Sequence, residues 1–222
     1  MTTTPLIALI SATPAAIKPA ELAIRTAIPA ARIWNLLDDR LLVDAQEVGG
    51  VNEELRERMV RLIRYALDAG AEGILLTCSQ YGAVARAIAV SEPNVPILAP
   101  DDAAFQAVAD GDFQRVLILA SLESALADTT DRLGALLNRS GTTELIGRVT
   151  SEAVAAAGRG DAQTLAEILG GAIRESGQVD AVLLAQYSLS IAQSKLEEQL
   201  GLPVFAGPNL AAELLASELK TP

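Results

Sequence analysis

The chain has 222 residues, half of them hydrophobic and only 3% aromatic, with a net charge of −11 and no histidine. This acidic balance argues against a nucleic-acid partner, because phosphate backbones are bound by Lys and Arg. The lack of histidine excludes Ser-His-Asp and Cys-His catalysis and most zinc sites.

In the first half of the chain, short apolar runs alternate with segments of helical period, which is typical of helices packed on a parallel sheet. The predicted strands, each expected to be buried on both faces, are Leu6–Ile10, Ala31–Asn35, Gly73–Thr77 and Val95–Leu98. The predicted helices are Pro14–Ala27, Asn52–Ala69 and Ser79–Val90.

The second half repeats this order. Its predicted strands are Arg115–Ala120, Glu144–Val149, Ala181–Ala185 and Pro203–Ala206, and its predicted helices are Ser124–Asn138, Asp161–Ser176, Ser188–Leu200 and Leu210–Leu219. The segment from Ala71 matches the segment from Val179, 108 residues later. This repeat predicts an α/β protein of two lobes, residues 1–100 and 101–222, with the C-terminal helix able to cross over to the first lobe.

The single cysteine, Cys78, cannot form an internal disulfide, which favours a reducing cytoplasm. The apolar stretch Leu6–Ile17 has no Lys or Arg before it and contains Pro14, unlike a signal peptide. No run reaches the roughly 18 apolar residues that a membrane span needs. We therefore expect a cytoplasmic protein that does not bind membranes.

Parallel sheets bind ligands at the carboxyl ends of their strands. Cys78 lies between an apolar strand and a helix, and a helix N-terminus stabilises a thiolate. The alternative is an inert buried cysteine. Hydroxyls in the same loops are suited to holding a carboxylate together with backbone amides, to capping their helices, or to both at once. These are Thr13, Thr77, Ser79, Ser121, Ser124 and Ser188.

Two carboxylate pairs, Asp38-Asp39 and Asp101-Asp102, also follow predicted strands. They suit acid–base work or a divalent cation, but helix capping and solvated turns are favoured for consecutive residues. The chain lacks phosphate-binding and dinucleotide-binding glycine motifs and a CxxC pair, and none of its three lysines follows a strand-like run. We therefore expect no cofactor and no metal.

Four segments carry a family resemblance: IALISATP from Ile7, NLLDD at Asn35–Asp39, GILLTCS at Gly73–Ser79 and VLLAQYSLS at Val182–Ser190. With the repeat, they make nearly the whole chain similar to the aspartate/glutamate racemase superfamily, which includes hydantoin racemase, maleate isomerase and arylmalonate decarboxylase. The resemblance implies two pseudo-symmetric, flavodoxin-like lobes with the active site between them. It leaves a homodimer as an option.

Racemases of this superfamily use two cysteines, one per lobe, as opposed acid and base without a cofactor. The resemblance places Cys78 at the first position and Gln186 at the second. Glutamine neither gives nor takes a proton near neutral pH, so the resemblance implies one-thiol chemistry. The expected substrate-binding residues are Ser11, Thr13, Thr77, Ser79, Ser121, Gln186, Tyr187 and Ser188.

The leading hypothesis is a cofactor-independent racemase or isomerase of a small carboxylate. Cys78 would act as the proton-transfer base and acid or as a nucleophile, and hydroxyls and backbone amides would stabilise an enediolate. A decarboxylase or C–X lyase using the same thiol, and a carboxylate-binding protein without catalysis, are the alternatives. A magnesium-dependent hydrolase built on the aspartate pairs is a more distant one.

Overall fold

The computed structural model describes residues 4–137 and 143–219. The chain divides into two compact units. The first contains the described residues up to Pro100 together with those from Pro208 onward, and the second is Asp101–Gly207 without the undescribed residues 138–142.

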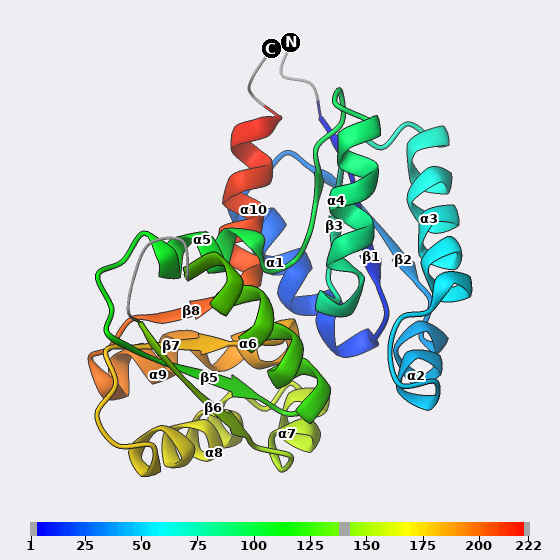
Figure 1. The fold of residues 1–222 in the computed structure, drawn as a ribbon. Helices are drawn as coiled ribbons and strands as arrows, with labels where there is room; N and C mark the ends of the chain where they lie inside the picture. The colour runs from blue at the N-terminus through cyan, green and yellow to red at the C-terminus, as the bar shows by residue number, and fades with distance from the viewer. Residues whose placement is uncertain (1–3, 138–142, 220–222) are drawn as a thin grey trace. The chain divides into compact units, whose positions relative to one another are not determined.

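The first unit is built on a parallel sheet of order β2-β1-β3-β4 (Figure 1). Its strands are β1 (Leu6–Ser11), β2 (Arg32–Leu37), β3 (Gly73–Leu76) and β4 (Ile97–Leu98). On one face, Ala8 and Ile10 of β1 share a buried core with Met59 of the helix α3. The helices of that face are α2 (Arg40–Glu47), α3 (Glu53–Asp68) and α4 (Gly82–Ser91).

The opposite face of this sheet is covered by α1 (Ile17–Ala27), which follows the short 3-10 turn η1 (Pro14–Ala16), and by α10 (Gly207–Glu218). The packing is close at Gly73, where an added Cβ would lie 3.1 Å from a Leu215 methyl group. Helices therefore cover both faces, and β1 and β3 are buried almost throughout because they occupy the middle of the sheet.

The second unit has the same topology, with the order β6-β5-β7-β8. Its strands are β5 (Arg115–Ala120), β6 (Glu144–Val149), β7 (Ala181–Leu184) and β8 (Val204–Ala206). One face packs on α7 (Ala153–Arg159), α8 (Ala162–Glu175) and α9 (Gln193–Leu200), and the other on α6 (Glu123–Leu137). The sheets are two copies of one pattern, which confirms the predicted α/β class.

Each half of the chain gives its last helix to the other unit. The helix α5 (Asp102–Ala109) follows β4 of the first sheet but belongs to the second unit, where it packs against α6 and β8. Conversely, α10 follows β8 but belongs to the first unit. Residues 208–222, assigned above to the second lobe with a crossover considered for the last helix, therefore group with the first unit as far as they are described.

The structure differs from two kinds of sequence prediction. All eight strands form, but Ala31–Asn35 was wrongly expected to be buried on both faces: β2 lies at the sheet edge, with Arg32 and Asn35 exposed. The helices α2, α5 and α7 were missed. They have 8, 8 and 7 residues, too few for a clear helical period.

The other predicted helices form with shifted ends, and Asn138, the predicted last residue of one of them, lies outside the described residues. Within the ranges 4–137 and 143–219, no helix combines the length and apolar character that crossing a membrane requires.

Candidate functional site

Cys78 follows the carboxyl end of β3. After the last residue of that strand, the Thr77 amide still donates to the Ile10 carbonyl of β1 over 3.0 Å, so the backbone stays in register up to the thiol. Cys78 itself has extended dihedrals and stands at the N-cap position of the 3-10 turn η2 (Ser79–Tyr81), which leads into α4. Its side chain is 8% exposed.

Two buried hydroxyls lie next to this position. The Thr77 hydroxyl donates to Ser11 Oγ over 2.9 Å, across the carboxyl ends of β3 and β1. Both side chains are at least 95% buried. Because β1 and β3 are adjacent parallel strands, the sheet alone brings these residues and Cys78 together at the carboxyl ends of the strands.

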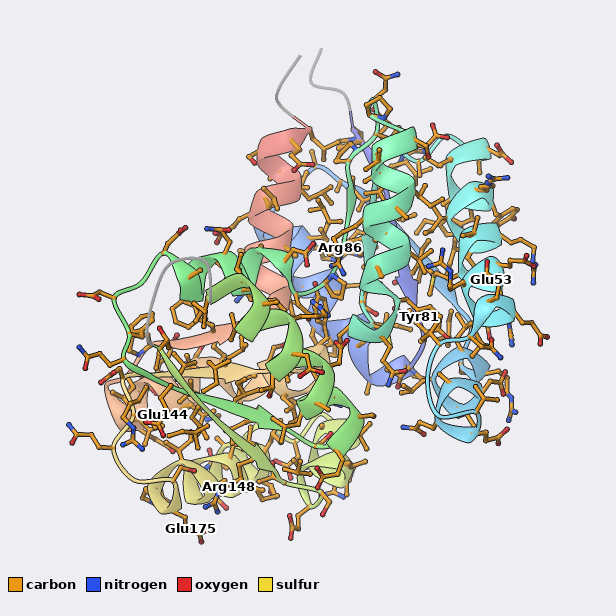
Figure 2. The ribbon with its side chains drawn as sticks, in the orientation of Figure 1. Glu53, Tyr81, Arg86, Glu144, Arg148 and Glu175 are labelled. Carbon is orange, nitrogen blue, oxygen red and sulfur yellow. The ribbon has the colours of Figure 1, made fainter. Side chains whose placement is uncertain are left out.

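Tyr81 connects this edge to the helix α2. Its hydroxyl donates to the Leu41 carbonyl over 2.8 Å, and Figure 2 shows Tyr81 at the start of α4. Burial raises the pKa of Tyr81, and the neighbouring Cys78 adds to the increase. The phenol therefore stays protonated and acts as a hydrogen-bond donor.

Gln186 occupies the corresponding place in the second unit. It follows β7 and stands at the N-cap position of the 3-10 turn η3 (Tyr187–Ala192). Its Oε1 accepts two hydrogen bonds from Ser121, one from the backbone amide over 2.7 Å and one from the hydroxyl over 2.9 Å. Ser121 follows the adjacent strand β5 and is 5% exposed.

The strand registers make Cys78 and Gln186 equivalent positions. Leu76 pairs with Ile10 in the first sheet, and Leu184 pairs with Leu119 in the second. Cys78 and Gln186 each lie two residues beyond these β3 and β7 positions. The two positions nevertheless differ in their surroundings. In the second unit, Ala120 and Ala185 take the places of Ser11 and Thr77, and alanine side chains form no hydrogen bond.

A buried ion pair lies elsewhere in the second unit. Both Nη atoms of Arg132 donate to Asp101 Oδ2 over 3.0 Å, and Nη1 also donates to Asp128 over 2.9 Å. Burial raises the pKa of Asp101 to about 6, although Arg132 opposes that increase. Burial also raises the pKa of Tyr187 well above its ordinary value, with a smaller contribution from Asp101.

The two carboxylate pairs differ as helix caps, because Asp38 Oδ1 accepts a hydrogen bond from the Arg40 backbone amide at the start of α2 over 3.2 Å. Asp39 and Asp101 stand at the N-cap positions of α2 and α5, but neither side chain makes a capping hydrogen bond. Asp38 also accepts from Arg58, whose Nε and Nη2 donate to its two oxygens over 2.5 and 2.6 Å. Within the described residues, no group of three or more Cys, Asp or Glu side chains could hold a metal ion.

The remaining predicted site residues lie at or within the 3-10 turns that follow the strands. Thr13 stands at the N-cap position of η1, but its side chain makes no capping hydrogen bond. Ser79 begins η2, and Ser188 lies half-buried within η3. Tyr187, the first residue of η3, is 3% exposed.

Sequence reasoning missed Arg58 and Arg132 as partners of the aspartates. Each contacts an aspartate 20 or 31 residues away, so no local spacing could have revealed the pair. A weak signal existed at Arg132, because Asp128 precedes it by four residues on one helix.

Comparison with known proteins places the chain in a family. Residues 60–215 match the family model described as Asp/Glu/Hydantoin racemase. No curated protein sequence matches the chain.

Solved structures share the fold. Glutamate racemase from Francisella tularensis, in complex with D-glutamate, is 11% identical with a TM-score of 0.71, covering 97% of this chain and 81% of its own. Aspartate racemase from Picrophilus torridus is 17% identical with a TM-score of 0.67, covering 97% and 92%. A Gly74Cys mutant of arylmalonate decarboxylase is 23% identical with a TM-score of 0.65, covering 96% and 94%.

Proposed function

The chain belongs to the Asp/Glu/hydantoin racemase family, and from that premise we propose that it is a cofactor-independent enzyme that uses Cys78 to move a proton on a small carboxylate substrate. The observation that carries this proposal is the place of the thiol. Cys78 follows a central strand, at the carboxyl end of the sheet, where Ser11 and Thr77 also lie.

The thiol is the group best suited to proton transfer in this chain. The sequence contains no histidine, and the ordinary pKa of cysteine, about 8.5, lies closer to neutrality than the ordinary pKa of any other residue type present. A thiolate removes a proton next to a carboxylate by forming S–H as the C–H bond breaks. The electron pair passes into the carboxylate to give an enediolate, and hydrogen-bond donors stabilise that charge.

A single thiol acts on one face of the substrate. It returns a proton to the face from which it removed one, so exchange of that proton with solvent outruns inversion. Inversion requires a second donor, and Gln186 cannot supply a proton near neutral pH. The proposed chemistry is therefore one-sided proton transfer rather than two-thiol racemisation.

Decarboxylation is the second candidate, favoured by the glutamine at the position equivalent to Cys78. In that reaction the C–C bond to a carboxylate breaks, CO2 leaves, and the electron pair remains on the α-carbon as the enediolate. The Cys78 S–H then protonates that carbon, and the thiolate takes a new proton from water. One thiol suffices for the whole cycle.

The test uses the intact protein and the substrates named by its structural neighbours: glutamate, aspartate, allantoin and an arylmalonate. In D2O, proton NMR reports α-hydrogen exchange and loss of CO2, while chiral chromatography reports inversion. We expect turnover of at least one compound and its loss in Cys78→Ser and Cys78→Ala. Full turnover in Cys78→Ala would exclude the mechanism, and binding of a compound without turnover would favour a non-catalytic carboxylate-binding protein.

A further inference from the structure

The outer edge of β2 is open within the first unit. Among the described strands, β2 pairs only with β1 (Figure 1), and the amides of Arg32 and Asp38 donate to carbonyls on the β1 side. Successive residues of a strand turn their backbone groups to opposite sides, so Ile33, Asn35 and Leu37 turn theirs away from β1. Within residues 4–137 and 143–219, these outward N–H and C=O groups have no hydrogen-bond partner. Such an edge is a template for another strand.

Apolar side chains border this edge on both faces of the sheet. On one face, the ring of Trp34 meets Tyr65 of α3 edge-on, with 5.4 Å between the ring centroids, and Tyr65 is 58% exposed. On the other face, α1 contacts β2 and leaves Leu22 67% exposed. Leu37, at the end of the strand, is 43% exposed. A strand added to β2 would therefore cover apolar surface as well as pair the open backbone.

Charge is distributed unevenly along the same edge. Arg32 begins the strand with an exposed side chain, and the ion pairs found in the described part of the chain do not include it. Asp38 and Asp39 follow the other end, and Arg58 neutralises only one of these two charges. The edge thus has a positive start and a negative end. An antiparallel copy of the strand complements this order, because it places each end beside its opposite.

We propose that β2 is a dimerisation strand, which pairs antiparallel with β2 of a second copy of this chain about a two-fold axis at Asn35. The outward-facing residues then exchange backbone hydrogen bonds with the copy, and the residues between them form the closely spaced pairs. The opposed positions are Arg32 with Asp38, Ile33 with Leu37, Trp34 with Leu36, and Asn35 with itself. Apolar residues meet apolar residues and opposite charges meet, and the two-fold axis closes the assembly at two chains.

The equivalent edge of the second unit is unsuited to such pairing. The strand registers place Arg148 of β6 where the first unit has Leu36 of β2. Arg148 donates to Glu175 over 2.7 Å, and Glu144 at the start of β6 accepts from Arg115 over 2.9 Å. Charged side chains on an edge strand oppose its pairing with another edge. The inference therefore concerns β2 and not β6.

The oligomeric state of the intact protein tests this inference. By multi-angle light scattering at micromolar concentrations, we expect twice the chain mass of 23.1 kDa. Trp34 is the only tryptophan, so its fluorescence reports on the edge itself. Because Leu36 of the copy would exclude water from the indole, dilution should shift the emission to longer wavelength as the mass falls.

Two variants alter the edge in different ways. Asn35→Pro removes the central outward N–H and leaves the hydrogen bonds to β1, so it should give a folded monomer by light scattering and circular dichroism. Arg32→Glu places like charges opposite each other at Asp38 on both sides of the axis, and the dissociation constant should rise about tenfold. The matched control is Arg159→Glu, the same change of charge at an exposed position of the second unit, which should leave the dissociation constant unchanged.

A wild type that keeps the monomer mass throughout the micromolar range would overturn the inference. A dimer that forms equally well in both edge variants, or that dissociates without a change in Trp34 emission, would also overturn it, because another surface would then hold the two copies. If Asn35→Pro does not fold, the comparison of Arg32→Glu with Arg159→Glu decides. None of these measurements involves Cys78, so their outcome is independent of the proposed function.

Discussion

The Thr77 hydroxyl donates to Ser11 Oγ over 2.9 Å, joining the ends of β3 and β1 immediately before the thiol. In the second unit, Ala185 and Ala120 occupy the equivalent positions, and the polar pair lies one residue further along, between Gln186 and Ser121. At the carboxyl ends of the strands, the side-chain hydrogen bond therefore lies one residue later in the second unit than in the first. Only the pair in the first unit is followed by a thiol.

The hydroxyls of Thr77 and Ser11 should contribute to stability as a pair, so that the costs of removing them are not additive. We expect Thr77→Val and Ser11→Ala each to cost about 1–2 kcal/mol of unfolding free energy, because each leaves a buried hydroxyl without its partner. The double variant should cost less than the sum. A double-mutant cycle by urea unfolding measures the difference, and strict additivity would contradict a direct bond.

The Tyr81 hydroxyl should stabilise α2 against local unfolding, because it donates to the Leu41 carbonyl of that helix. In Tyr81→Phe the Leu41 carbonyl loses its buried donor, and we expect a loss of about 1–2 kcal/mol. Hydrogen exchange should quicken in α2 before it does in α3. Tyr65→Phe is the control, since Tyr65 is 58% exposed. Equal effects of the two variants would show that the Tyr81 hydroxyl does not anchor the helix.

Loss of Arg132 should destabilise the second unit in a pH-dependent way. The pKa of Asp101, about 6, lies above the ordinary value of about 3.9, so this carboxyl favours the protonated form in the folded state. That preference adds stability below about pH 4 and is lost as the pH rises through 6. Arg132→Met leaves the deprotonated Asp101 without its main partner, and we expect a cost of about 3 kcal/mol at pH 8.

At pH 5 the cost of Arg132→Met should be distinctly smaller, because Asp101 is then largely neutral in the folded state. Denaturant unfolding at the two pH values measures the change. Asp101→Asn, which does not titrate at this position, should show little difference between pH 5 and pH 8. A cost of Arg132→Met that is the same at both pH values would assign its role to packing over Phe105, which the guanidinium covers at 4.7 Å.

Much of the fold could be predicted because the strands carry their own signal. Runs such as Gly73–Leu76 and Ala181–Leu184 are short and apolar at every position, which is typical of strands buried on both faces of a sheet. The repeat then fixed the shared topology. The short helix α5 was missed because its 8 residues are too few to show a clear helical period. Its packing partners, α6 and β8, lie later in the chain, so nothing local to it shows this packing either.

The sequence by itself determined the two-sheet α/β class, the family resemblance, and the single thiol with glutamine at the equivalent position, because all three depend on residues and spacing along the chain. Only the tertiary structure decided what these residues contact. Gln186 Oε1 meets Ser121 from 65 residues away, and Arg132 meets Asp101 across 31 residues. A hydrogen bond forms only between groups that the fold brings within about 3 Å of each other, and periodicity carries no such information.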